Sequence, residues 1–188
     1  MKHFGTKYLE TERLELRKFV IEDAKDMFNN WASDAKVTKF LTWPAHESME
    51  VSASVLEEWT KAYSQPDYCQ WAIILKGNGN DPIGCIGVNT IDERTEMAHI
   101  GYCLGRQWWH QGIMSEALKR VIEFLFDEVE VKRIESRFDP NNLHSGAVME
   151  KCGMKYEGTL RMADWNNQGI CDASYYTILK DEYSIVYL

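Results

Sequence analysis

The sequence has no uncharged apolar run of about 18 residues, the length that a membrane-spanning helix needs. Residues 1–7 also lack the apolar core of a secretion signal, so we expect a cytoplasmic protein. Basic residues are outnumbered, since 21 Lys and Arg stand against 29 Asp and Glu and give a formal charge of -8. A surface of this sign disfavours nucleic acid and anionic membranes as partners and mildly favours a cationic one.

Cysteines are few, odd in number and widely spaced. They are Cys69, Cys85, Cys103, Cys152 and Cys171. This pattern supports neither a disulfide framework nor a zinc site, so we expect buried free thiols. No histidine pair has metal-ligand spacing, and we predict no metal. Two phosphate-binding motifs are missing as well: a Gly-x-x-x-x-Gly-Lys-Ser/Thr loop, and Gly-x-Gly-x-x-Gly after an N-terminal strand.

The hydrophobic residues that the sequence does contain are enough for one hydrophobic core. The chain has 188 residues, 45% of them hydrophobic, and we expect a single domain over 1–188. Hydrophobic alternation, helical periodicity and turn residues predict strands near 11–17, 70–75, 83–91, 97–104, 133–138, 156–165 and 170–179, and helices near 22–31, 48–63, 113–129 and 143–152. The order βααβββαβαββ predicts a mixed α/β (α+β) fold: one twisted mixed sheet of about seven strands with helices on both faces.

The stretch from Arg106 to Leu118 connects a buried strand to a helix. The first turn of a helix has unpaired backbone N–H groups and the positive end of the helix dipole, so it can hold an anion without basic side chains. Gly112 would let the backbone approach a phosphate closely. The alternative is a glycine required at the turn for steric reasons alone.

Several spaced motifs resemble those of a known family. They are Thr11-x-Arg13-Leu14-x-Leu16-Arg17, Trp109 to Ala117, Asn142-x-x-Ser145 followed by Met149 to Met154, Tyr156-Glu157-Gly158 with Leu160-Arg161, and Gly169-x-x-Asp172-x-x-x-Tyr176. Over about residues 11–180 the sequence resembles the GNAT superfamily of acyl-CoA-dependent N-acetyltransferases, and within it the Rim-type acetyltransferases of ribosomal-protein N-termini. It departs from the usual Gln/Arg-x-x-Gly-x-Gly/Ala loop at Trp109 and Met114, and His110 stands where Rim-type proteins commonly have glycine.

The resemblance implies a site for acetyl-CoA. The residues expected to bind the pyrophosphate, the thioester or pantetheine are Tyr102, Cys103, Leu104, Trp109, His110, Gln111, Gly112, Ile113, Met114, Ser115, Asn142 and Lys151. Within this set, the backbone N–H groups near residues 102–104 would polarise the thioester carbonyl, and Lys151 would meet the phosphates.

The resemblance also implies catalytic candidates. Ser145 would donate a proton to the departing sulfur, although a serine at this place can equally be a helix N-cap. Tyr176 is the alternative acid, or a packing residue of its strand. Asp164 is favoured over Glu157 as the base, and their odd separation predicts opposite faces of an unbroken strand. Each carboxylate can also be a solvated surface group.

The expected acceptor is the α-amine of a protein such as a ribosomal protein. An α-amine has a pKa of about 7.7–8.0 against about 10.4 for lysine, so a weak base suffices for it. Two alternatives stay open: a small amine such as a polyamine or aminoglycoside, and a CoA-binding module without turnover. A homodimer is compatible with the resemblance, and the sequence does not decide the oligomeric state.

Overall fold

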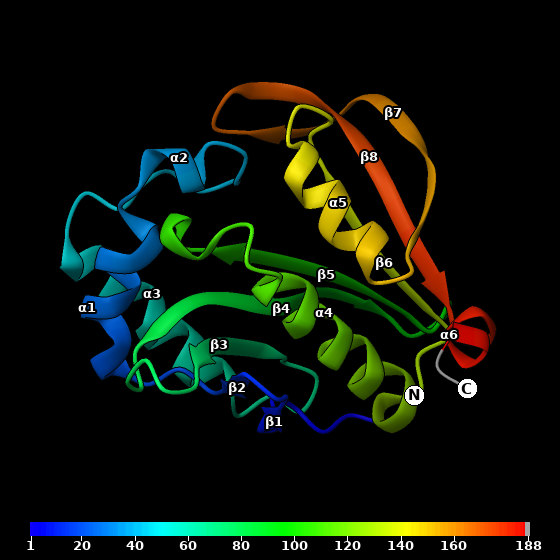
Figure 1. The fold of residues 1–188 in the computed structure, drawn as a ribbon, viewed down its shortest axis with the longest axis horizontal. Helices are drawn as coiled ribbons and strands as arrows, with labels where there is room; N and C mark the ends of the chain where they lie inside the picture. The colour runs from blue at the N-terminus through cyan, green and yellow to red at the C-terminus, as the bar shows by residue number, and fades with distance from the viewer. Residues whose placement is uncertain (187–188) are drawn as a thin grey trace.

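The computed structural model describes residues 1–186, which form one eight-stranded sheet with the strand order β1-β2-β3-β4-β5-β6-β8-β7 (Figure 1). The strands are β1 (Leu9–Glu10), β2 (Leu14–Arg17), β3 (Gln70–Leu75), β4 (Pro82–Asp92), β5 (Met97–Leu104), β6 (Arg133–Phe138), β7 (Lys155–Asn166) and β8 (Gly169–Leu179). Neighbours are antiparallel except β5 and β6, which are parallel because a helical crossover connects them. The predicted mixed sheet is confirmed, and its count is eight because the short edge strand β1 was not predicted.

Helices cover both faces of the sheet. They are η1 (Ile21–Asp23), α1 (Ala24–Met27), η2 (Phe28–Ala32), α2 (Ala35–Thr38), α3 (Met49–Ala62), η3 (Arg106–Trp108), α4 (Ile113–Phe124), η4 (Leu125–Val129), α5 (Leu143–Lys151) and α6 (Lys180–Val186). The first predicted helix is thus a run of 3-10, α and π turns, and the one-turn helix α2 follows it. None of the helices within residues 1–186 is both long enough and apolar enough to cross a membrane.

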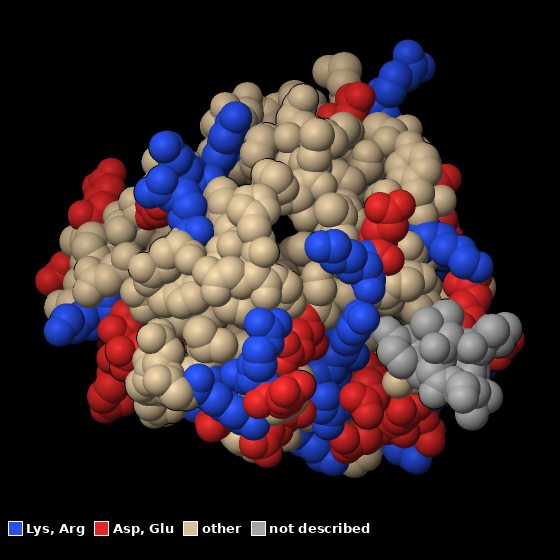
Figure 2. Space-filling model, viewed as in Figure 1, with Lys and Arg blue, Asp and Glu red and all other residues tan. Residues whose placement is uncertain are grey.

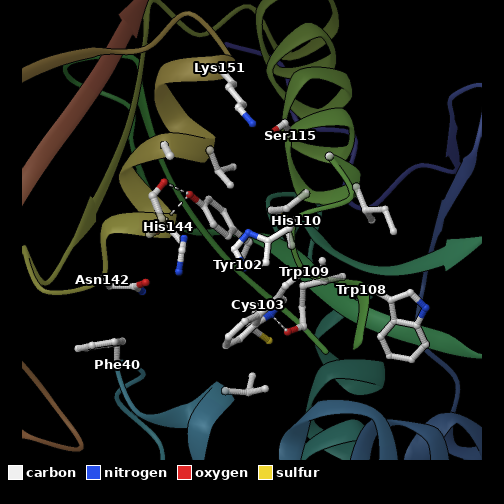
Figure 3. Close-up of a pocket in the computed structure, with 18 of the residues that line it drawn as sticks. Phe40, Tyr102, Cys103, Trp108, Trp109, His110, Ser115, Asn142, His144 and Lys151 are labelled. Atoms are coloured by element: carbon white, nitrogen blue, oxygen red, sulfur yellow. Dashed lines mark hydrogen bonds between the residues drawn. The ribbon is translucent and has the colours of Figure 1, made fainter. Parts of the chain in front are cut away.

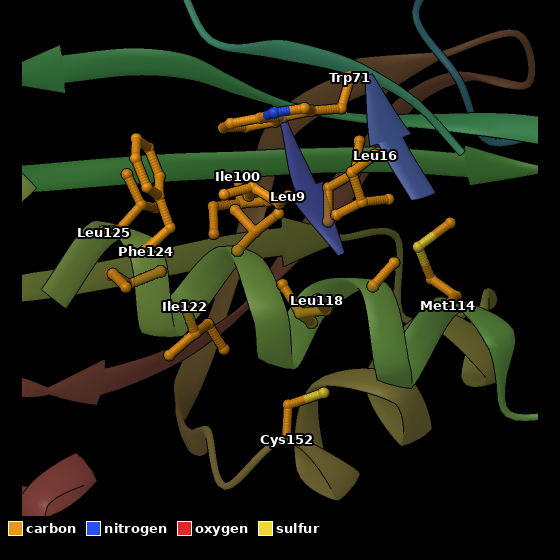
Figure 4. Packing of buried hydrophobic residues seen from close by; sticks show 14 of the residues in the cluster. Leu9, Leu16, Trp71, Ile100, Met114, Leu118, Ile122, Phe124, Leu125 and Cys152 are labelled. Atoms are coloured by element: carbon orange, nitrogen blue, oxygen red, sulfur yellow. The ribbon is translucent and has the colours of Figure 1, made fainter. Parts of the chain in front are cut away.

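Helix α4 is held on the sheet by one apolar face. Ala117, Leu118, Val121 and Ile122 recur at helical spacing and are at most 1% exposed (Figure 4). They belong to the same buried cluster as Trp71 and Ile100 of the sheet. Full burial of a leucine or isoleucine side chain contributes about 1.5–3 kcal/mol, so packing rather than helix propensity fixes the position of α4.

A second apolar cluster fills the opposite face. Trp31 and Leu56 pack there with Ala72 and Ile74, while Trp71 and Ile73 of the same strand point toward α4. This alternation along β3 is the reason that a continuous apolar run can serve two helical layers.

The sheet opens between β5 and β6. The two strands pair only where residues 97–99 meet residues 133–135, and beyond this point they part. The open end of the split lies between the start of α4 and the start of α5, and the candidate site is found there.

Candidate functional site

A pocket of about 210 Å³ occupies the split (Figures 2 and 3). Its walls come from the end of β5, the turn before α4, helix α5 and the segment after α2. The lining residues are Val37, Phe40, Leu41, Tyr102, Cys103, Leu104, Trp108, Trp109, His110, Gly112, Ile113, Met114, Ser115, Asn142, His144, Ser145, Ala147, Val148 and Lys151. In Figure 3, Lys151 and Ser115 lie at one end of the pocket and Phe40 at the other.

Most residues predicted for the coenzyme line this pocket. The exception is Gln111, whose side-chain Nε2 donates to the carbonyl of Gln107 at 2.8 Å. Sequence reasoning missed Val37, Phe40 and Leu41, which reach the pocket from a segment that precedes β5 by more than fifty residues. Their apolar character was visible in the sequence, but only the fold brings them to the split.

The turn before α4 has the geometry of an anion site. Gly112 is the N-cap of α4 with a φ of +74°, and a Cβ there would meet only Arg13 Nη2, at 3.6 Å. The left-handed backbone and the open space above it leave the amides of the first helical turn accessible. His110, at the position where a glycine was expected, also has a positive φ, of 60°. The backbone therefore keeps the glycine-like turn although the side chain differs.

Arg13, which directly precedes β2, contacts this turn, a role that was not predicted from the sequence. Its Nε donates to Glu116 Oε2 at 2.6 Å, and its Nη1 donates to the carbonyl of Gln111 at 3.1 Å. Thr11 Oγ1 also donates to Glu116, at 2.6 Å. These bonds fix the start of α4 to the first strands and place a guanidinium beside Gly112.

We expect Arg13→Ala to weaken the binding of CoA about fivefold, or about 1 kcal/mol, because a partly exposed charged contact is worth no more than this. The rate with acetyl-pantetheine, which has no diphosphate, should stay within twofold of wild type. Calorimetric binding and steady-state kinetics check the two expectations, with Arg94→Ala, an exposed arginine between β4 and β5, as the control. Equal losses with both donors would show that Arg13 acts on the fold and not on the phosphate turn.

Tyr102 and Ser145 meet across the pocket. The Tyr102 hydroxyl donates to the Ser145 carbonyl at 3.0 Å and lies 3.2 Å from Ser145 Oγ (Figure 3). Burial raises the pKa of the Tyr102 phenol above its ordinary value of 10, so it stays protonated. Tyr102 was predicted only for its backbone N–H. The alternation along β5, with Ile100 and Leu104 buried on the same side, could have shown that its side chain faces α5.

Helix α5 removes one alternative for Ser145. Asn142 occupies the N-cap position of α5, and its side chain makes no capping bond. Ser145 lies inside the first turn, so its hydroxyl is not an N-cap. Two ring contacts connect the first turn of α5 with the turn before α4: the His144 ring centroid lies 4.7 Å from that of His110 and 6.5 Å from that of Trp109.

The five cysteines are free thiols: Cys69, Cys85 and Cys152 are buried, as expected, whereas Cys103 and Cys171 are only half-buried. Cys103, which lines the pocket, has its Sγ 3.4 Å from Cys85 Sγ on the neighbouring strand. Among the side chains that the structure describes, no group of three His, Cys, Asp or Glu residues is arranged to hold a metal ion.

The two carboxylates of β7 lie outside the pocket lining and are both paired with arginines of β6. Glu157 bonds Arg133 at 2.8 and 2.9 Å, and Asp164 lies 2.8 Å from Arg137 Nε. Arg133 and Arg137 are four residues apart on one strand and share a face, so Glu157 and Asp164 share it too. The prediction of opposite faces is wrong because β7 is not an unbroken strand: its pairing with β8 shifts between 156 and 158 and again between 160 and 164.

Arg133 and Thr177 hold the pKa of Glu157 at about 2, well below its ordinary value near 4.5. This carboxylate is therefore a weak base. The lowered pKa means that the pair stabilises the fold above pH 4.5 and loses this contribution as the pH falls toward 2.

We accordingly expect wild type to be more stable than Glu157→Gln above pH 4.5 and the difference to vanish near pH 2. It should not exceed about 1 kcal/mol, because the Glu157 side chain is 45% exposed. Thermal unfolding of both proteins at pH 2–6 checks this. A difference that stays constant across that window would contradict the assigned ion pair.

Tyr176, the alternative candidate for the acid, packs against two other aromatic side chains. Its ring centroid is 5.8 Å from that of Phe138 and 5.6 Å from that of Tyr156, and it lies outside the pocket lining. This placement corresponds to the packing alternative.

The split between β5 and β6 thus brings the start of α4, whose free amides can hold an anion, and the Tyr102–Ser145 pair into one pocket. A family model described as acetyltransferase (GNAT) domain matches residues 13–155. The chain therefore belongs to the GNAT family and is an N-acetyltransferase.

Individual proteins agree with this assignment. The protein named uncharacterized N-acetyltransferase p20 of Bacillus licheniformis is 31% identical over 176 residues, which cover 94% of this chain and 98% of that protein. Ribosomal-protein-serine acetyltransferase of Escherichia coli (strain K12) is 26% identical over 172 residues, 91% of this chain and 95% of that one. The fold is similar to that of microcin C7 self immunity acetyltransferase MccE in complex with acetyl-CoA and AMP, with a TM-score of 0.80 and 23% identity, covering 90% of this chain and 93% of that chain.

Proposed function

We propose that this N-acetyltransferase moves an acetyl group from acetyl-CoA to the α-amine at the N-terminus of a peptide chain. One observation carries the proposal. One pocket is lined both by the turn at Gly112 and by Ser145, and it lies where β5 and β6 part, which supports binding of the phosphates near Gly112 and of the thioester near Ser145.

The residues of the pocket fit acetyl-CoA. The amides that follow Gly112 suit the diphosphate, and Lys151 adds a cation at the same end (Figure 3). Asn142 and Val148 line the same pocket, and we expect pantetheine to lie beside them. The backbone N–H groups of Tyr102 and Leu104 point toward the side that β5 shared with β6, and they become available for the carbonyl oxygen where the two strands part. The Cys103 N–H points the other way, toward Cys85 of β4.

In the proposed reaction the amine nitrogen bonds to the carbonyl carbon while the carbon–sulfur bond breaks. Ser145 Oγ is positioned to give a hydrogen bond or its proton to the departing sulfur, and a proton that it gives up is replaced from solvent. The Tyr102 hydroxyl holds Ser145 from the other side by donating to its carbonyl. Asp164 remains our candidate to accept the amine proton through water, since it lies on the sheet face away from α5. Because Asp164 is paired with Arg137, we expect it to be a weak base.

Three considerations favour an α-amine as acceptor. About a tenth of α-amino groups are already neutral at pH 7, so the paired carboxylates do not have to supply a strong base. The formal charge of -8 suits a cationic acceptor. The Escherichia coli relative is named as a ribosomal-protein-serine acetyltransferase, which makes a ribosomal protein the first acceptor to test.

An acceptor panel tests the proposal by release of the CoA thiol. It contains a short basic peptide with a free N-terminus, the same peptide with a blocked N-terminus and one internal lysine, spermidine, and an aminoglycoside. We expect the free-N-terminus peptide to give the highest kcat/KM. A higher kcat/KM with spermidine or the aminoglycoside would show that the acceptor is a small amine and not a peptide. Binding of acetyl-CoA without thiol release for any amine would indicate a CoA-binding module without turnover.

A further inference from the structure

The tip of the β7–β8 hairpin crosses the open end of the sheet and bonds to the segment after α2 (Figure 1). The Asn167 backbone N–H donates to the Leu41 carbonyl at 3.1 Å. The two hydrogens of its side-chain Nδ2 serve the carbonyls of Thr38, at 2.8 Å, and Trp43, at 2.7 Å. We call Asn167 with these three carbonyl groups the Asn167 latch.

The Asn167 latch joins the two halves of the sheet where no strand pairing does. The ladder between β5 and β6 ends at His99 and Glu135, so β1–β5 and β6–β8 separate beyond that point. The latch reconnects them on the face away from α5. Both side-chain donors of Asn167 are used, and carboxylate or aliphatic side chains cannot reproduce this pattern.

Two further contacts extend the latch into a closed belt. Arg106 Nε donates to Asp34 Oδ2 at 2.8 Å and ties the start of α2 to the turn after β5. Asn166 Nδ2 donates to Asp139 Oδ2 at 2.8 Å and ties the hairpin to the end of β6. The belt thus runs from β5 through α2 and the hairpin to β6, and it surrounds the open end of the split.

The belt also forms a wall of the pocket. Val37, Phe40 and Leu41 line the pocket and lie next to the carbonyls that the latch holds. Widening this wall requires the breaking of latch hydrogen bonds, which opposes the movement. The aperture on this face is therefore fixed by hydrogen bonds and not by the side chains of the wall alone.

We infer that the Asn167 latch determines acceptor specificity: it holds the wall so that the α-amine of a first residue with a small side chain can enter, while the α-amine of a first residue with a bulky aromatic side chain is excluded. This inference rests on the proposed function. Asn167 acts by positioning the wall, so its loss should affect the acceptor and leave the binding of acetyl-CoA at α4 unchanged.

The test compares wild type with Asn167→Ala and Asn167→Asp, and uses Gln168→Ala, the exposed neighbour in the same turn, as the matched control. We expect the KM for a peptide whose first residue has a small side chain to rise about tenfold in both Asn167 variants, and the relative rate with the same peptide beginning with phenylalanine to increase. The Kd for acetyl-CoA should stay within twofold, and Gln168→Ala should behave as wild type. An unchanged ratio of the rates with the small-residue and phenylalanine peptides in the Asn167 variants would overturn the inference.

Amide hydrogen exchange provides a reading that does not depend on turnover. In Asn167→Ala we expect faster exchange in residues 38–43 and unchanged exchange in α4. Equal exchange in residues 38–43 of wild type and variant would show that the latch does not hold the wall. If the wild-type protein acetylates no amine but hydrogen exchange changes as expected, the proposed function is wrong, and Asn167 still holds the wall. If the wild-type protein acetylates amines but neither the acceptor preference nor the exchange changes in the Asn167 variants, only the inference about Asn167 is wrong.

Discussion

Replacement of Gly112 by tryptophan is expected to weaken the binding of acetyl-CoA by on the order of 100-fold, which is about 2.7 kcal/mol. Two effects add. The position has a φ of +74°, and a non-glycine residue in this region costs about 1–3 kcal/mol. The indole would also occupy the open space over the first turn of α4, where the structure has only Arg13 at 3.6 Å from the added Cβ.

Gly77→Trp is the matched control for this prediction. Gly77 has a φ of +80° and nothing within 4 Å of an added Cβ, in the turn between β3 and β4, so it takes the same backbone strain away from the pocket. Isothermal calorimetry gives the Kd and thermal unfolding gives the stability. Wild-type affinity in a folded Gly112→Trp protein would show that the phosphate site is elsewhere, and equal losses in both variants would show a general effect on the fold.

Ser145→Ala is expected to lower kcat by about 100-fold and to leave the Kd for acetyl-CoA within a few-fold, because general acid catalysis typically contributes about 10²–10⁴-fold. Tyr102→Phe should lower kcat by about tenfold, since the phenol is 3.2 Å from Ser145 Oγ and orients it. In the double variant the two effects should not multiply: its kcat should be close to that of Ser145→Ala, because Tyr102 acts through Ser145.

The pH dependence of the rate shows whether Tyr102 acts by orienting Ser145 or by ionising. The pKa of Tyr102 lies above its ordinary value, so the rate of wild type should show no loss assignable to a phenolate below pH 10. Tyr176→Phe serves as the control, since Tyr176 packs against Phe138 and Tyr156 and should change kcat less than twofold. Multiplicative losses in the double variant, or a full rate in Ser145→Ala, would remove Ser145 from the proposed reaction.

The parts of the site that local sequence determines were predictable. The strand over residues 97–104, the turn at Gly112 and the apolar periodicity of α4 all lie in one continuous stretch, and each has its own signal in composition or spacing. A helix between two strands then required the parallel pairing of β5 and β6. These local rules agree with one another, so the position of the pocket followed from them.

The parts that depend on distant contacts were not predictable. Glu157 and Asp164 were assigned to opposite faces because Gly158 and Met162 give no advance sign of the two register shifts in β7. Arg13 reaches the phosphate turn across 98 residues, and Asn167 reaches Thr38 across 129. A side chain that bonds a backbone carbonyl so far away leaves no periodic or spacing signal, and only the folded sheet brings the partners together.

The most direct measurement is the crystal structure of the protein with CoA bound. We predict that the diphosphate oxygens lie within hydrogen-bond distance of the backbone N–H groups that follow Gly112, and that the sulfur lies between β5 and α5 beside Ser145. A diphosphate bound away from the start of α4, or a sulfur on the far side of the sheet from Ser145, would contradict the account.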